Sequence, residues 1–257
     1  EQHRVALIGP STGAMVLHQP VKPYIFNVRA TYQREAERAM AHLASIGVRK
    51  VAVVHVDDSF GADGLQGARN GLKAAGLEPV AVAKFDRTKP DFAPLLPALQ
   101  PAEPQAVLII GSGTAVVEGI RSLKAARVGG QYLTLSNNAS GGFIKLLGDQ
   151  AQGVIVSQVM PASLNFGLVK EATQLAKAKG VDEVSPAMLE GFASAKVLVE
   201  ALRRAGAKPS RASLHQALDN LGRLDLGGLV LDYSPSDHTG LDFADLSIVG
   251  TGGRFRR

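Results

Sequence analysis

Short apolar runs alternate with amphipathic stretches along the chain as far as Pro161. The runs Val5–Ile8, Lys50–Val56 and Ala106–Ile110 are largely apolar, which is typical of strands buried on both faces of a parallel sheet. Between the first two, Gln33–Ile46 has apolar residues at helical spacing. Four successive β-α repeats predict a parallel sheet covered by helices on both sides. Further strands are expected over Tyr24–Val28, Pro79–Phe85, Tyr132–Leu135 and Val154–Val159, and further helices over Gly61–Ala75, Asp91–Leu99 and Thr114–Ala126.

The pattern changes after Pro161, where helical spacing dominates. The chain thus contains one complete α/β unit, about Ala30–Val156, and its flanking segments are expected to pack together as a second lobe. A two-lobed α/β protein usually binds its ligand between the lobes, at the carboxyl ends of strands. The elements expected in this last part are helices over Leu168–Lys179, Pro186–Ala205 and Ser210–Leu218, and strands over Gly227–Asp232 and Leu246–Gly250.

Composition narrows the range of functions. The 257 residues include 28 Lys and Arg against 23 Asp and Glu, a formal charge of +5, and 46% are hydrophobic. This is the composition of a folded chain, and its dispersed charge argues against nucleic-acid binding. The absence of Cys excludes disulfides and Cys-ligated metals, and no pair of histidines has zinc-motif spacing. We interpret the basic run Arg254–Arg257 as a solvated tail, and no apolar stretch is long enough to span a membrane.

The segment Gly9–Gly13 matches the nucleophile-elbow pattern G-x-S-x-G, with Asp237 and His238 later in the chain. In hydrolases of that kind several strands precede the elbow, whereas only a short segment precedes Ser11 here. The same turn follows a strand, and its free backbone N–H groups would suit a carboxylate. A tight turn in which Ser11 or Thr12 caps a helix is an equally good interpretation.

Three more polar clusters follow predicted strands. Gly111–Val116 lacks the third glycine of a dinucleotide fingerprint, which argues against NAD, but its small residues leave room for a ligand. The pair Asp57-Asp58 either caps the next helix or holds Mg²⁺ or a proton, and Phe60 beside it either stacks on a ligand or covers the core. The polar run Ser136–Asn138 either binds a small polar ligand or caps a helix near Ser140–Leu147. Since the carboxyl ends of parallel strands share one edge, these clusters are expected to converge on a ligand site.

The order of these segments resembles the periplasmic solute-binding proteins of ABC transporters for branched-chain amino acids, which have the type I periplasmic binding fold. The resemblance extends over nearly the whole chain. It is carried by LIGPSTGA from Leu7, FNVRATY from Phe26, VAVVHVDDSFG from Val51, GVIVSQVMP from Gly153, EGF from Glu190 and YSPSDHTG from Tyr233.

The resemblance implies an α/β fold of two Rossmann-like lobes with parallel sheets. The first lobe would comprise residues 1–29 and 160–241, and the second residues 30–159 and 242–257. Crossovers are expected near Phe26–Ala30, Ser157–Pro161 and Gly240–Ala244. A ligand bound between the lobes would draw them together by a hinge motion. The family's opening βα units are missing ahead of Val5, so we expect an incomplete first lobe whose uncovered sheet edge invites self-association.

The resemblance also assigns binding residues. The carboxylate-binding turn corresponds to residues 11–14, the aromatic cover to Phe60, and other contacts to residues near the predicted strand ends. No acid occurs at 136–138 to balance a ligand ammonium, so the ligand is expected to lack an amine unless Glu190 or Asp57 supplies that charge. The residues expected to bind the ligand are Ser11, Thr12, Gly13, Ala14, Tyr32, Phe60, Gly113, Thr114, Ser136 and Asn137.

The expected function is capture of a small carboxylate or amino acid between two lobes, for delivery to an ABC transporter permease. No catalysis, cofactor, metal or nucleic acid is expected, and the location implied by the resemblance is the periplasm, with a leader removed. Two alternatives stay open. One is a cytoplasmic ligand sensor on the same fold, and the other is a serine hydrolase that uses Ser11. The sequence does not identify the ligand.

Overall fold

A computed structural model describes residues 3–256 of the chain. These residues divide between two compact units. Within the described residues, unit 1 comprises residues 3–31 and Val159–Phe243, and unit 2 comprises Tyr32–Gln158 and residues 244–256. Each unit has its own hydrophobic core, so each is described separately.

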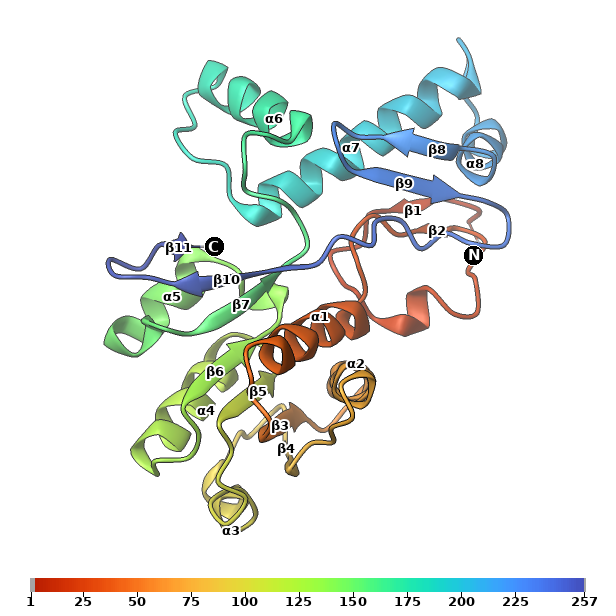
Figure 1. The fold of residues 1–257 in the computed structure, drawn as a ribbon. Helices are drawn as coiled ribbons and strands as arrows, with labels where there is room; N and C mark the ends of the chain where they lie inside the picture. Colours follow the sequence, from red (N-terminus) through yellow and green to blue (C-terminus); the bar gives the residue numbers. More distant parts are fainter. Residues whose placement is uncertain (1–2, 257) are drawn as a thin grey trace. The chain divides into compact units, whose positions relative to one another are not determined.

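Unit 2 is built on a sheet of seven strands in the order β11-β10-β7-β6-β5-β3-β4 (Figure 1). The five strands from β4 to β7 run parallel, whereas β10 is antiparallel to β7 and β11 is antiparallel to β10. The α/β class and the parallel sheet are as the sequence predicts. The strands are β3 (Val51–Val56), β4 (Ala81–Phe85), β5 (Ala106–Ile110), β6 (Gln131–Thr134), β7 (Ile155–Gln158), β10 (Asp245–Val249) and β11 (Phe255–Arg256).

Helices cover both faces of this sheet. Every residue of β3 and β5 is buried. On one side, alternate residues of both strands belong to the hydrophobic cluster that includes α4 and α5. On the other side α2 contacts β3 and β5, and α1 contacts β7 and β10. Burial on both faces explains why these strands read as continuous apolar runs. The helices of unit 2 are α1 (Tyr32–Ser45), α2 (Ser59–Ala74), α3 (Leu96–Leu99), α4 (Gly113–Ala125) and α5 (Gly141–Leu147), with 3₁₀ turns η2 (Ala93–Leu95), η3 (Ser136–Asn138) and η4 (Gly148–Ala151).

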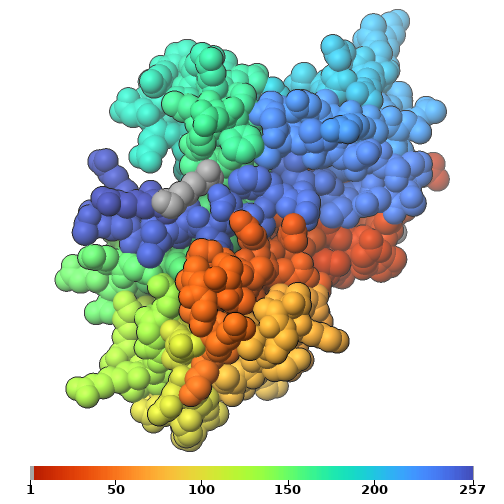
Figure 2. Space-filling model, in the orientation of Figure 1, coloured from red at the N-terminus to blue at the C-terminus, as the bar shows by residue number. Residues whose placement is uncertain are grey.

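Helices α1 and α2 pack in direct contact (Figure 2). Glycines on α2 form the contact surface. A Cβ atom at Gly67 would lie 2.3 Å from the backbone oxygen of Gln33, and one at Gly71 would lie 2.8 Å from that of Glu37. Only the absence of a side chain permits this approach, which fixes the position of the first turn of α1.

Unit 1 has two small sheets instead of one large one. Strands β1 and β2 form a parallel pair, and β8 and β9 form an antiparallel hairpin. Its core contains Phe26, Tyr233 and the inner sides of the helices. The elements of unit 1 are β1 (Leu7–Ile8), η1 (Met15–Leu17), β2 (Ile25–Phe26), α6 (Gly167–Ala178), α7 (Pro186–Ala205), α8 (Arg211–Asp219), β8 (Gly222–Asp225) and β9 (Val230–Tyr233).

Three local expectations need correction. The helix predicted over Asp91–Leu99 is instead η2 followed by the single turn of α3, because Pro94 and Pro97 interrupt the helical hydrogen bonds. The hairpin partner β8 was not predicted. Within the basic run at the end of the chain, β11 pairs with β10 and Phe255 packs against the core, so this run is not simply a solvated tail. Arg257 lies outside the described residues. In residues 3–256 we find no helix with the length and apolar character needed to cross a bilayer.

Candidate functional site

Most of the predicted binding residues of unit 2 lie at the carboxyl edge of its sheet. Strand β3 leads to Asp58 and Phe60, β5 leads to Gly113 and Thr114, and β6 leads to Ser136. Because β3, β5 and β6 are parallel, their carboxyl ends meet at one edge. The convergence that the sequence predicts is therefore present within this unit.

Two aromatic residues form a pair at this edge. Tyr32 begins α1 and Phe60 lies in the first turn of α2. Their ring centroids are 4.5 Å apart and their planes are tilted by 58°. Tyr32 is buried, whereas Phe60 is half-buried and also packs against the core of unit 2. Phe60 thus covers the core with one side and keeps a partly exposed side, so both interpretations of this residue stay open.

The loops after β5 and β6 are tied together by amide groups. Asn138 accepts a hydrogen bond from the backbone N–H of Gly113 (2.9 Å), and its Nδ2 donates to the carbonyl of Gly111 (3.0 Å). Asn137 donates to the same carbonyl at 2.9 Å. The cap of α5 is Ser140, whose hydroxyl accepts from Phe143 N. The polar run at 136–138 therefore joins two loops and does not cap that helix.

A buried acid lies beside Ser136 that the sequence analysis did not identify. One carboxylate oxygen of Glu35 accepts the backbone N–H of Ser136 (2.8 Å), and the other accepts its hydroxyl (3.0 Å). The hydroxyl of Ser157 also donates to Glu35. Asp57, one of the two acids expected to supply charge here, pairs with Lys84 at 2.9 Å. The sequence does contain an indication, since Glu35 falls on the buried face of α1 with Ala36, Ala39 and Leu43.

Asp58 is the cap of α2. Its carboxylate accepts the N–H of Gly61 at 3.1 Å and binds Nε of Arg87 at 2.6 Å. Burial alone would raise the pKa of Asp58, but the hydrogen bonds from Gly61 and Arg87, together with the charge of Arg87, outweigh it and hold the pKa below its usual value. Of the two interpretations of Asp57-Asp58, the structure shows the cap.

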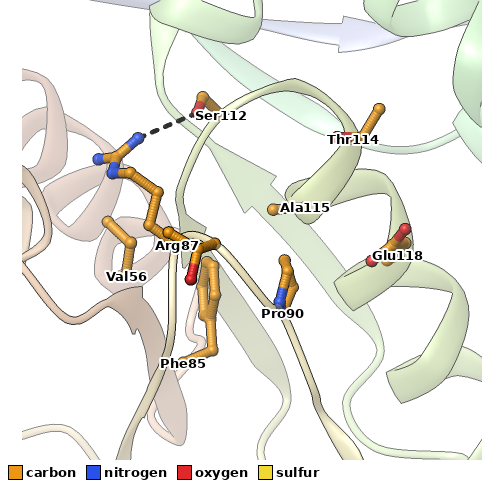
Figure 3. Close-up of a pocket in the computed structure, with 9 residues that line it drawn as sticks. Val56, Phe85, Arg87, Pro90, Ser112, Thr114, Ala115 and Glu118 are labelled. Atoms are coloured by element: carbon orange, nitrogen blue, oxygen red, sulfur yellow. Dashed lines mark hydrogen bonds between the residues drawn. The ribbon is translucent and has the colours of Figure 1, made fainter.

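A cavity of about 220 Å³ opens at the ends of β3, β4 and β5 (Figure 3). Both apolar and polar side chains line it. Arg87, held by Asp58, also donates to the hydroxyl of Ser112 at 3.4 Å. Among the predicted binding residues, Thr114 lines this cavity, and the sequence analysis missed Arg87 and Glu118. The lining residues are Val56, Phe85, Arg87, Thr88, Pro90, Ser112, Thr114, Ala115 and Glu118.

The remaining predicted residues, Ser11 to Ala14, form a turn in unit 1 between β1 and η1. The N–H of Thr12 donates to the carbonyl of Pro10 (2.7 Å), and the hydroxyl of Thr12 accepts from Ala14 N (3.4 Å). Among the described residues, the amides of Ser11 and Gly13 have no hydrogen-bond acceptor. No side chain caps η1, so the simple helix-cap interpretation does not hold. Two backbone donors are available instead for an anion.

The residues of the hydrolase alternative have structural roles in unit 1. His238 stacks on Phe26 with ring centroids 4.1 Å apart, its Nδ1 lies 3.1 Å from the carbonyl of Ile25, and its Nε2 lies 3.2 Å from Asp219. Asp237 accepts the N–H of Thr239. The ring of His238 thus stacks on Phe26, with Nδ1 at a backbone carbonyl and Nε2 beside Asp219, and none of these contacts involves Ser11. Glu190, the other acid considered for the ligand charge, lies 4.0 Å from Arg29.

Comparisons with known proteins agree with this architecture. A family model described as periplasmic binding protein matches residues 1–244. A substrate-binding periplasmic protein from Ralstonia solanacearum is 31% identical, with a TM-score of 0.84 over 99% of this chain and 73% of that one. A possible leucine/isoleucine/valine-binding protein from Rhodopirellula baltica is 26% identical, with a TM-score of 0.84 over 100% of this chain and 72% of that one.

A third solved structure shows the same fold at lower identity. It is a branched chain amino acid ABC transporter protein from Thermus thermophilus with bound valine, 22% identical, with a TM-score of 0.79 over 99% of this chain and 71% of that one. The present chain thus spans between two thirds and three quarters of the length of each of these three proteins.

Proposed function

Because the chain belongs to the periplasmic binding protein family, we propose that it captures a small carboxylate or amino acid for delivery to an ABC transporter permease. The proposed location is the periplasm. Capture involves no bond making or breaking. Affinity comes from backbone N–H donors, polar side chains and aromatic contact, and it is reduced by the conformational entropy lost when one ligand engages both units.

The observation that carries this proposal is the arrangement at the carboxyl edge of the sheet in unit 2. An aromatic pair, Tyr32 and Phe60, lies at the same edge as the tied loops of Gly113 and Ser136. A few fixed polar groups beside an aromatic surface are what a small-molecule site needs. In unit 1, the amides of Ser11 and Gly13 would supply the donors for a ligand carboxylate.

Thermal denaturation against a panel of amino acids and aromatic acids tests the proposal. A ligand that binds only the folded chain stabilises it by mass action, by about 2.7 kcal/mol at a concentration of one hundred times Kd. We expect at least one member of the panel to raise Tm, and Phe60→Ala to reduce that rise. Gln66→Ala, on the exposed face of the same helix, is the control and should leave the rise unchanged. No rise with any member would contradict the proposal.

A further inference from the structure

A second cavity of unit 2 lies between helix α1 and strands β7, β10 and β11, which form one end of the sheet (Figure 1). Its volume is about 320 Å³, which is within the range of small-molecule sites. None of the residues that line it is among the predicted binding residues, and none lines the cavity at the ends of β3, β4 and β5. The function proposed above therefore leaves this cavity unexplained.

Strand register forms the floor of this cavity. Ile248 on β10 is paired with Ile155 on β7 and with Arg256 on β11, and directly paired residues share one face of a sheet. Leu246, two residues before Ile248, lies on the same face, whereas Val249 lies on the other and belongs to the cluster of α4 and α5. The three aliphatic residues Ile155, Leu246 and Ile248 line the cavity as one apolar patch, and Ile248 is 39% exposed.

The groups around this apolar patch are mainly cationic. Arg38 and His42 lie one turn apart on α1 and line the cavity, and among residues 3–256 neither side chain has a hydrogen-bond or ion-pair partner. Arg256 is held in place on β11. Its guanidinium donates to the hydroxyl of Thr251 at 3.3 Å, and its Nε lies 2.6 Å from the position that a Cβ atom on Gly250 would occupy. Arginine in such a position is suited to bind a carboxylate through two parallel hydrogen bonds.

We propose that this cavity is a second binding site, which takes a small amphipathic organic anion such as a short-chain aliphatic carboxylate. The hydrocarbon chain lies on the apolar patch, and the carboxylate accepts hydrogen bonds from Arg38 and Arg256. Asp245 also lines the cavity, and its carboxylate accepts the backbone N–H of Leu246 at 2.9 Å. Two arginines against one aspartate leave an excess of positive charge, which favours an anion over a cation. This site does not depend on the proposed function.

An NMR titration of the chain with hexanoate at fixed ionic strength tests this site. We expect saturable shifts of the backbone amides of His42, Leu246 and Ile248. Hexanamide has the same shape without the charge, and it should bind at least about tenfold more weakly because hydrogen bonds to a charged group are stronger. Butanoate is shorter by two CH₂ groups and should also bind about tenfold more weakly. No saturable shift at these amides, or equal affinity for hexanoate and hexanamide, would overturn the proposal.

Charge-matched variants separate a defined site from general attraction of anions to a basic chain. Arg38→Gln and Arg256→Gln should each weaken hexanoate binding at least about tenfold. Arg69→Gln removes the same charge from an exposed position of α2 outside the cavity, so it should change the affinity by less than about twofold. Ile248→Ala reduces the apolar patch and should weaken binding about threefold. Equal weakening by all three arginine variants, or no effect of Ile248→Ala, would mean non-specific attraction and would contradict the site.

A variant of the carboxyl edge distinguishes this site from that of the proposed function. Phe60→Ala removes an aromatic contact there, so hexanoate bound at that edge would bind the variant more weakly. We expect the shifts of Leu246 and Ile248 and their dissociation constant to be the same in Phe60→Ala as in the native chain. A weaker response in Phe60→Ala would place hexanoate at the carboxyl edge and overturn the second site. If hexanoate behaves as expected while no amino acid or aromatic acid raises Tm, the proposed function fails and the second site stands.

Discussion

The two units differ in how their strands are buried and in how their segments are joined. In unit 2, strands β3 and β5 are buried along their whole length inside one large sheet. In unit 1, the strand pairs are short, and β8 and β9 alternate between more and less buried residues. Polar groups there join segments far apart in the sequence. Asn27 donates to the carbonyl of Leu17 at 2.9 Å, and Tyr233 donates to the carbonyl of Asn27 at 2.5 Å.

The difference shows what each unit is sensitive to. Unit 2 depends mainly on apolar area removed from water and on close helix packing, and these contributions are large at single positions. Unit 1 has only short strand pairs, and the buried hydrogen bonds of Asn27 and Tyr233 add to its core, each contributing about 1 kcal/mol net. Substitutions of the same kind should therefore change the free energy of unfolding by different amounts in the two units.

The largest effect is expected in β5, an inner strand of the sheet in unit 2. Ile109→Ala in β5 removes a fully buried side chain between β5 and α4, and it should lower the free energy of unfolding by about 2–5 kcal/mol. Urea denaturation measures this. Val199→Ala, in an exposed position of α7, should change it by less than about 0.5 kcal/mol. A loss below about 1 kcal/mol at Ile109 would mean that unit 2 is not held mainly by this core.

Close packing of α1 on α2 gives the next largest effect. Gly67→Ala places a Cβ atom 2.3 Å from the backbone oxygen of Gln33, so it should destabilise the chain by about 1–3 kcal/mol. Alanine favours a helix over glycine by about 1 kcal/mol. A net loss of stability is therefore expected only if the steric clash costs more than this gain. Gln66→Ala, one position earlier and exposed, is the control. Net stabilisation by Gly67→Ala would contradict the observed helix contact.

In unit 1, Tyr233→Phe removes the hydroxyl that donates to Asn27 and should cost about 1–2 kcal/mol. The pKa of Tyr233 is raised by burial, so the folded chain keeps this proton where the unfolded chain releases it. Its contribution is complete below the ordinary tyrosine pKa and falls as pH rises above it. Stability measured from neutral to alkaline pH should therefore decline less steeply in Tyr233→Phe, and equal slopes would contradict this.

Tyr132 makes the same comparison in unit 2. Its hydroxyl donates to the carbonyl of Val128, and burial raises its pKa to about 12. Tyr132→Phe should flatten the alkaline decline in the window between the ordinary tyrosine pKa and about 12. Measured together, the two variants show whether both units contribute to the loss of stability at alkaline pH.

The smallest effect is expected at the cap of α2. Asp58→Ala should cost about 1 kcal/mol at neutral pH. Because the pKa of Asp58 is lowered in the folded chain, its contribution is present above the ordinary aspartate pKa and is lost as the pH falls through the folded value. As the pH is lowered, the free energies of unfolding of the variant and the native chain should converge. A difference that stays constant down to low pH would contradict the role of the carboxylate.

The elements that the sequence predicts best are those fixed by local pattern. β5 is found at Ala106–Ile110 and α7 at Pro186–Ala205, as predicted, because five aliphatic residues in a row and a long capped amphipathic stretch each allow one structure. β8 escaped prediction because Gly222–Asp225 contains one strongly apolar residue, Leu224. Its pairing with β9 depends on the turn between them, which places two glycines at positive φ.

The candidate site was harder to predict because its geometry depends on pairs distant in sequence. The spacing of strands predicts that Phe60, Gly113 and Ser136 share one edge. It does not predict that Glu35, on a helix 101 residues away, places its carboxylate on Ser136. A charged residue within the apolar stripe of α1 indicates a buried polar contact, but the partner depends on how that helix packs on the sheet.

Amide resonances followed by NMR during a ligand titration test the central claim most directly. The probe is the panel compound that raises Tm most. The account predicts that the amides of Gly13 in unit 1 and Ser136 in unit 2 both shift, with one dissociation constant shared between them. Shifts confined to one unit, or found only away from these two residues, would contradict it.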